Sequence, residues 1–185
     1  MAEEARTDES DLADLVTMAH RFYREGRDHS SDWRSEAVEA YDMVANRQWS
    51  DEDLSMLKEQ NRPAVTFNRI ARTLNAIVGT ELNNRHETRF IPREQGDAKV
   101  NEVLTAASEW VRDETDAEDE ESDAFEDTCI AGMGWTETRL SYENDPDGAI
   151  CIDRVDPLEM YWDPTATKRN LADARWVLRV KRIPF

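Results

Sequence analysis

Apolar residues recur every three or four positions over most of the first 130 residues, and this spacing predicts a mainly helical region. Ser10, Ser50 and Thr66 are expected to cap helix starts, because their hydroxyl oxygens can accept backbone N–H groups. Gly26 and Gly132 are expected to end helices, and Asn61-Arg-Pro63 interrupts the pattern before a short extended segment at 64–67. The predicted helices cover residues 10–25, 32–45, 50–57, 67–84, 100–111 (after a turn at 95–97) and a segment from a break near Thr115 to Gly132, with Ala124, Phe125 and Cys129 buried.

From Trp135 onward the apolar period changes from 3.6 to 2, which is typical of strands. Residues 135–142 and 149–155 alternate, and the turn residues of Asn144-Asp-Pro-Asp-Gly148 join them, so we predict a β-hairpin. Further strands are expected at 86–92, 160–162 and 174–183. The fold class predicted is therefore α+β, with amphipathic helices followed by a small antiparallel sheet.

The charge is strongly negative and unevenly distributed. The 185 residues carry a net charge of −18, with −11 over residues 101–128 and +3 over residues 61–100. Such a chain repels a polyanion on average, which excludes tight phosphate binding by the surface as a whole. The basic segment either meets phosphate or pairs with the acidic helices, within the fold or across a subunit boundary; its arginines are Arg62, Arg69, Arg72, Arg85, Arg89 and Arg93.

Candidate chemistry is sparse, and we expect no enzyme, no catalytic residue, no cofactor and no metal site. Cys129 and Cys151 are the only cysteines and are interpreted as reduced, mostly buried thiols of a cytosolic protein. Glu143, Asp145, Asp147 and Gly148 resemble the start of a calcium loop, but the twelfth position is Arg154, so a plain hairpin turn is favoured. Gly132-Met-Gly134 precedes a predicted strand, which favours a helix-to-strand turn over a dinucleotide-binding loop.

No segment approaches the ~20 apolar residues of a membrane span, and the acidic N-terminus is neither a secretory signal nor a transit peptide. We therefore expect no membrane partner.

Several segments, in this order, resemble the N-terminal region of portal proteins from short-tailed (podovirus-type) bacteriophages. The resemblance covers roughly residues 35–183. The segments that carry it are Gln48-Trp-Ser-Asp-Glu52, Asn61-Arg-Pro-Ala-Val-Thr-Phe-Asn-Arg-Ile70, Val78-Gly79, Asn83-Asn-Arg85, Phe125-Glu-Asp-Thr-Cys-Ile-Ala-Gly-Met-Gly-Trp135, Arg154-Val-Asp-Pro-Leu-Glu-Met-Tyr-Trp-Asp-Pro164 and Asp173-Ala-Arg175.

This resemblance implies a structural subunit of a dodecameric ring at one capsid vertex of a phage or prophage. Double-stranded DNA passes through such a ring, without sequence-specific binding, during packaging and ejection. The implied partners are further copies of the subunit, coat or scaffolding protein, terminase and tail adaptors. The implied location is the portal vertex of the virion, with host cytoplasm during assembly.

Portal subunits of this type are several hundred residues long, so the resemblance also implies an excised piece, a truncated prophage gene or a fragment. The expected organisation is an acidic helical segment over 1–30 and the N-terminal part of a wing-like α+β domain over 31–185. A second hypothesis stays open, in which the −11 segment belongs to a free-standing acidic interaction domain that mimics DNA or binds a host factor.

Overall fold

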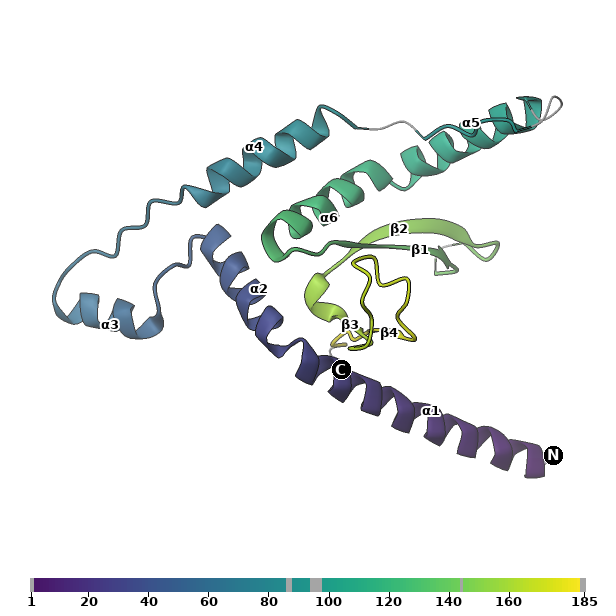
Figure 1. Ribbon diagram of the computed structural model, residues 1–185, viewed down its shortest axis with the longest axis horizontal. Coiled ribbons are helices and arrows are strands. Elements are labelled where there is room, and N and C mark those ends of the chain that lie inside the picture. The colour runs from purple at the N-terminus through teal and green to yellow at the C-terminus, as the bar shows by residue number, and fades with distance from the viewer. Residues whose placement is uncertain (1, 86–87, 94–97, 144, 184–185) are drawn as a thin grey trace. The chain divides into compact units, whose positions relative to one another are not determined.

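The computed structural model describes residues 2–85, 88–93, 98–143 and 145–183 (Figure 1). Its described residues form six α-helices and two small antiparallel sheets, which confirms the α+β class. The chain divides into two compact units. Residues 1–38 and 158–185 form unit 1, and residues 39–157 form unit 2. The predicted boundary between residues 30 and 31 stays a prediction.

Unit 1 is built on α1 (Ala2–His29), the first part of α2 (Ser31–Val44), and the strand pair β3 (Met160–Trp162) and β4 (Val177–Arg179). Aromatic contacts hold these pieces together. The Phe22 ring stacks on Trp176 with 4.7 Å between ring centroids, and Trp33 meets Trp162 edge-on at 5.5 Å. The predicted strand at 160–162 is confirmed, whereas the one at 174–183 is shorter than predicted.

α1 extends beyond the predicted 10–25 in both directions, so Ser10 is not its N-cap and Gly26 does not end it. Gly26 is buried inside the helix for a packing reason. A Cβ atom at this position would lie 3.1 Å from both Trp176 Cη2 and Tyr161 Cβ. The glycine therefore permits close approach of β3 and the residues before β4.

Arg34 of α2 binds the chain around β3. Its Nη1 donates to the carbonyl oxygen of Leu158 at 2.5 Å, and its Nη2 donates to that of Met160. The guanidinium carbon also lies 3.8 Å from the Tyr161 ring centroid, a favourable cation–π distance.

Unit 2 contains α3 (Asp51–Glu59), α4 (Ile70–Leu82), α5 (Ala98–Glu114), α6 (Ala117–Ala131) and the hairpin of β1 (Trp135–Ser141) and β2 (Ala149–Val155). α6 contacts α4, α5 and both strands, so it is the central element of this unit (Figure 1). The 3-10 helix η1 (Pro157–Glu159) follows β2.

The hairpin is confirmed, and its register sets Trp135 opposite Val155 and Ser141 opposite Ala149. Its turn is a polar one in which the Asp145 carboxylate accepts the Asp147 N–H at 2.9 Å. The predicted turn thus joins the two strands, although Asn144 lies outside the described residues.

The helix-to-strand turn at 132–134 is also confirmed. Gly132 ends α6 with φ +80°, a left-handed conformation that glycine adopts without a steric penalty. Gly134 then passes so close to α6 that a Cβ atom would lie 1.9 Å from the carbonyl oxygen of Ala124. This contact fixes where the hairpin leaves the helix.

Ser50 caps α3 as predicted, by accepting the Asp53 N–H at 3.1 Å. Thr66 does not cap α4, because its hydroxyl accepts Trp49 Nε1 at 3.0 Å instead. α4 begins at Ile70, and Asn68 Oδ1 accepts the Ala71 N–H at its start. A side chain two positions later than predicted therefore supplies the cap.

Two further predictions are wrong. The described part of the predicted 86–92 strand, residues 88–92, is not a strand, and the Phe90 N–H donates to Thr105 Oγ1 at 3.1 Å. The predicted turn at 95–97 lies outside the described residues. The cysteines are free, but Cys129 is exposed and Cys151 is half-buried, so they are not mostly buried thiols. Ala124 is buried as predicted, and Phe125 is only half-buried.

No helix within the described residues has the length and apolar character needed to cross a bilayer.

Candidate functional site

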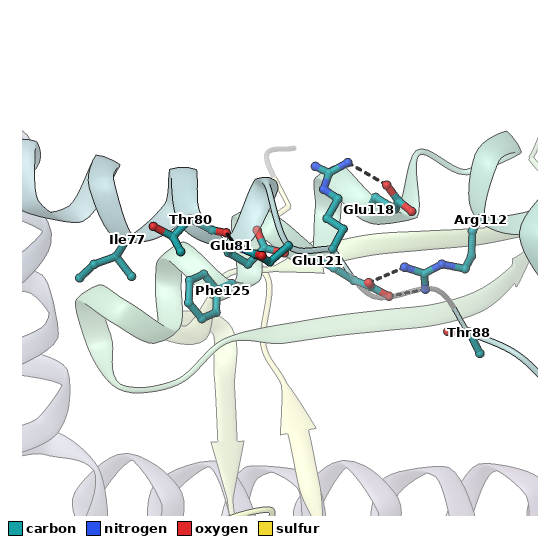
Figure 2. A pocket seen from close by; sticks show the side chains of 10 residues that line it. Ile77, Thr80, Glu81, Thr88, Arg112, Glu118, Glu121 and Phe125 are labelled. Atoms are coloured by element: carbon teal, nitrogen blue, oxygen red, sulfur yellow. Dashed lines mark hydrogen bonds and ion pairs between the residues drawn. The ribbon is translucent and has the colours of Figure 1, made fainter.

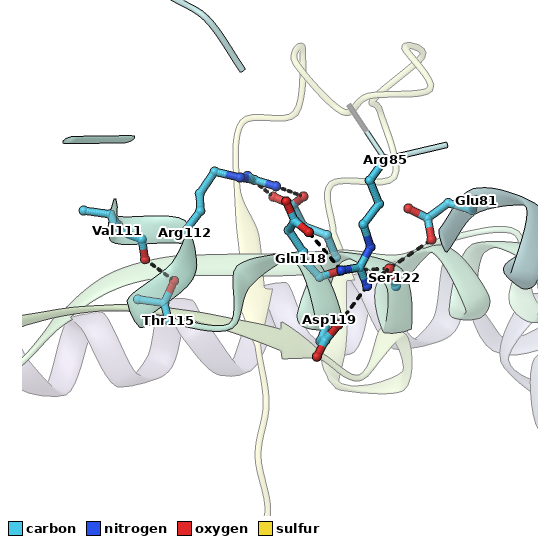
Figure 3. Close-up of polar contacts among 9 residues, drawn as sticks. Glu81, Arg85, Val111, Arg112, Thr115, Glu118, Asp119 and Ser122 are labelled. Atoms are coloured by element: carbon cyan, nitrogen blue, oxygen red, sulfur yellow. Dashed lines mark hydrogen bonds and ion pairs between the residues drawn. The ribbon is translucent and has the colours of Figure 1, made fainter. Parts of the chain in front are cut away.

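The acidic start of α6 meets a basic residue at the end of α4 (Figure 3). Arg85 Nη1 donates to Glu118 Oε2 at 2.9 Å, and Nη2 donates to Asp119 Oδ1 at 2.7 Å. The hydrogen bond with Asp119 is the largest cause of a raised pKa of Arg85. This pairing confirms, for Arg85, the interpretation that basic-segment arginines pair with an acidic helix.

Ser122 extends this contact to α4. Its hydroxyl accepts a hydrogen bond from Arg85 Nη2 at 3.2 Å and lies 2.9 Å from Glu81 Oε2, to which it can donate. Ser122 is buried, so these hydrogen bonds are shielded from bulk water. The end of α4 is therefore joined to α6 by the hydrogen bonds that Ser122 makes with Glu81 and Arg85.

Arg112 makes a second link, from α5 to α6. Its Nη1 and Nη2 donate to Glu121 Oε1 and Oε2 at 2.8 and 2.7 Å, a bidentate pair. The hydrogen bonds from Arg112 lower the pKa of the Glu121 carboxyl. α6 thus forms ion pairs with Arg85, which follows α4, and with Arg112 of α5.

These links surround a cavity of about 670 Å³ among α4, α5 and α6. Figure 2 shows Ile77 and Phe125 at one end and Arg112 with Glu121 at the other. The two arginines in its wall, Arg85 and Arg112, are already paired with carboxylates. The cavity therefore offers little attraction to an anion, and we assign it a structural role.

A third cluster joins α2, α6 and β2. Asp127 is 2% exposed and accepts the Tyr41 hydroxyl at 2.7 Å and Arg154 Nε at 2.5 Å. Burial, followed by the bond to Asp127, raises the pKa of Tyr41. Sequence reasoning used Arg154 to reject a calcium loop and as part of a segment that carries the resemblance, but it did not predict this cluster. Within the described residues, no group of three or more His, Cys, Asp or Glu side chains is placed to hold a metal ion.

In unit 1, two segments quoted for the resemblance meet around Asp163. This carboxylate is fully buried and accepts Arg175 Nε at 2.6 Å, the Thr165 N–H at 2.9 Å and Thr165 Oγ1 at 2.8 Å. Asp173 likewise accepts the N–H and hydroxyl of Thr167, both at 2.8 Å. The Trp-Asp-Pro and Asp-Ala-Arg segments therefore act together to close one loop.

The surface is the most unusual feature of the chain. It exposes 14923 Å², against about 9,000 Å² for a compact monomer of 21.4 kDa and about 11,000 Å² for two separate compact domains. Many large apolar side chains are exposed on it, which is typical of a protein that binds partners. In unit 2 the exposed large apolar side chains include Leu54, Met56, Val65, Phe67, Ile77, Val100, Val103, Trp110, Leu140 and Ile150.

Comparison with known protein families matches residues 20–185 to the Phage P22-like portal protein family. The chain belongs to this family. Portal proteins form oligomeric rings at the portal vertex of the virion, contact other components of the phage head, and are structural rather than catalytic. A search of curated proteins finds no match.

Membership gives the exposed apolar surface of this portal protein a physical reason. A subunit of a ring exposes, when alone, the faces that it buries against its neighbours. The ion-paired clusters around α6 then stabilise the fold of one subunit. Their contacts are explained without assigning them a catalytic role. The contrast between a basic segment and an acidic helix indicated the Arg85 pairing, whereas no charge pattern in the sequence singled out Asp127 with Tyr41 and Arg154.

Proposed function

We propose that this portal protein is part of the head–tail ring of a short-tailed phage or prophage, through which double-stranded DNA is packaged and ejected. Copies of the chain self-associate around the channel in a dodecamer. Terminase docks on the ring during packaging, and tail adaptors dock after it. Coat or scaffolding protein surrounds the ring in the capsid, and assembly takes place in the host cytoplasm.

The family match over residues 20–185 carries this proposal. The exposed apolar surface supports self-association, because an assembly that hides it gains about 25 cal/mol per Å² of apolar area. The net charge of −18 supports passage of DNA without adhesion.

The structure favours this role over a free-standing acidic DNA mimic. A mimic would present a row of unpaired carboxylates, whereas Glu118, Asp119 and Glu121 are paired with arginines. Large exposed apolar residues would also serve no purpose in a protein that binds a basic surface through charge.

Light scattering and negative-stain microscopy of the purified chain test the proposal. We expect oligomers whose mass is a fixed multiple of 21.4 kDa, and rings with a central opening. A chain that stays monomeric from low to high concentration and binds a basic host protein in place of DNA would instead establish the acidic interaction domain.

A further inference from the structure

α3 and its flanking segments form a projection that buries little within its own unit. We name residues 49–67 the α3 arm; it lies between α2 and α4 (Figure 1). No residue of α3 is buried, and among the described residues every hydrogen bond of α3 stays within positions 50–62. The Ser50 cap and the acidic first turn account for the helix, but no contact among the described residues buries its apolar side chains.

Two side-chain bridges hold the base of the arm. Trp49 Nε1 donates to Thr66 Oγ1 at 3.0 Å, which joins its two ends. Asn68 Nδ2 donates to the carbonyl oxygens of Met43 and Val44 at 3.2 and 2.9 Å, which joins the start of α4 to the end of α2. The arm is therefore held at a defined point, while its tip has no described contact of its own.

The arm carries apolar side chains into solvent. Phe67 is 82% exposed and Met56 is 55% exposed, and Leu54 and Val65 are also exposed. Four large apolar residues within 14 positions of a polar segment form a patch typical of an interaction surface.

Unit 2 also contains an apolar groove that suits apolar side chains like those of the α3 arm. It has a volume of about 280 Å³ and lies among α2, α4 and α6; its wall includes Met43, Val44, Ile70, Leu74, Ile77 and Cys129. This volume is at the lower limit for small-molecule pockets, so it suits a few protein side chains better than a drug-sized ligand.

Charge is complementary between the two surfaces. Asp51, Glu52 and Asp53 form the first turn of α3. Arg69 precedes the groove-lining Ile70 and lies about 90° from the centre of the groove-lining face of α4, at 100° per residue. Arg69 is exposed, so this cation is available to an incoming acidic helix.

We propose that the α3 arm of one copy binds in the α2–α4–α6 groove of the next copy. This inference rests on the proposed ring, and it names the contact that closes it. The arm and the groove are different surfaces, so each copy binds one neighbour and is bound by another. Contacts of this heterologous kind generate rings when the rotation between copies closes.

Cys129 in the groove allows a direct test on the full chain. Leu54→Cys, in a Cys151→Ser background, places one thiol on the apolar side of α3 and keeps the native thiol of the groove. Under mild oxidation we expect dimers and longer ladders on a non-reducing gel, formed about tenfold faster than with the control Glu59→Cys on the opposite side of α3, because bound surfaces have a high effective concentration. The ladder must disappear when Cys129→Ser is added.

Reversing the charges of Arg69 and Asp51 provides a second test. Arg69→Asp alone and Asp51→Arg alone should each shift the chain toward smaller species in light scattering, and the double variant should restore the oligomer. Single variants that leave the oligomer unchanged would contradict the complementarity.

The outcomes separate the inference from the proposed function. If the wild-type chain forms rings but Leu54→Cys reacts no faster than Glu59→Cys, the ring stands and the arm contact is wrong. A disulfide formed within one copy would show that the arm covers its own groove, which also overturns the inference. A wild-type chain that forms no oligomer would contradict the proposed function itself.

Discussion

Asp163 shows how a buried charge is retained at the level of one residue. Its carboxylate receives donors from Arg175 and from both the backbone and side chain of Thr165. A buried carboxylate is tolerated when its lone pairs are satisfied in this way. The hydrogen bond from Arg175 is the largest cause that holds the pKa of the Asp163 carboxyl far below its ordinary value, against the opposing effect of burial.

We predict that Asp163→Asn lowers the melting temperature at pH 7 and flattens its decline in acid. Because the folded-state pKa is depressed, the stabilisation by Asp163 is complete above about pH 5 and is lost as the pH falls below about 4 toward the lowered pKa. Thermal unfolding of both proteins from pH 3 to pH 7 measures this. The gap between them should narrow as the pH falls from 5 to 3, and a constant gap would contradict the role of the charge.

Gly134 has no room for a side chain, because its backbone packs closely against α6. Gly134→Ala sets a methyl carbon 1.9 Å from the Ala124 carbonyl oxygen, so β1 or α6 must shift. We expect a loss of about 3 kcal/mol in the free energy of unfolding, typical of overpacking that moves backbone.

Gly79→Ala is the matched control, since no atom lies within 4 Å of its added Cβ and the position is inside α4. It should gain about 0.8 kcal/mol from helix propensity. Urea unfolding of the two variants gives both values, and equal effects would mean that the close approach at Gly134 does not matter.

Among the elements, those with a regular apolar period could be predicted from the sequence. α2, α5, α6 and the β1–β2 hairpin lie where the pattern predicts them, because their local propensity and their tertiary contacts agree. α3 also lies where the pattern predicts it, and there the Ser50 cap and local propensity account for the helix. The errors occur where a residue distant in the sequence determines the local structure. Gly26 stays helical because it packs on Trp176, and Thr66 cannot cap α4 because it receives Trp49.

The start of α4 depends on Asn68, which also holds the base of the α3 arm. Asn68→Ala removes the acceptor of the Ala71 N–H and both donors to the end of α2. We expect a loss of about 1 kcal/mol, the usual cost of a lost helix cap, together with faster tryptic cleavage after Lys58 in the arm.

Asn75→Ala is its control, because this asparagine is exposed inside the same helix. That variant should be slightly stabilised, by about 0.5 kcal/mol, since alanine is the better helix former. Unchanged cleavage of the arm in Asn68→Ala would show that the Trp49–Thr66 bridge is enough to hold its base.

For the whole molecule, the sequence predicted a strongly acidic protein but not how its charge is used. It indicated that basic residues meet the acidic helices, and Arg85 does so. It could not reveal the Asp127 cluster, because Tyr41 and Arg154 come from separate elements that only the folded chain brings together. The partners of Asp163 lie nearby in one loop, but periodicity does not predict the loop conformation that turns them toward its carboxylate. Nor does periodicity distinguish an apolar face buried within one copy from a face left for a neighbour.

We predict that the chain does not retard double-stranded DNA at 150 mM salt, and that lowering the salt to 20 mM does not create binding. At a net charge of −18, repulsion from phosphate grows as screening falls. A gel-shift titration at the two salt concentrations measures this. Binding that appears only at low salt would reveal a basic patch strong enough to overcome the average charge.

The discontinuity of unit 1 has a consequence for biosynthesis. Its first 38 residues leave the ribosome long before residues 158–185 exist, and all of unit 2 is made in between. At about 5–20 residues per second, the Phe22 ring is without Trp176 for about 8 to 30 seconds, whereas unit 2 can already fold. The nascent helix α1 therefore passes through an interval in which its aromatic face is open to chaperones, and the N-terminal unit is the last to be completed.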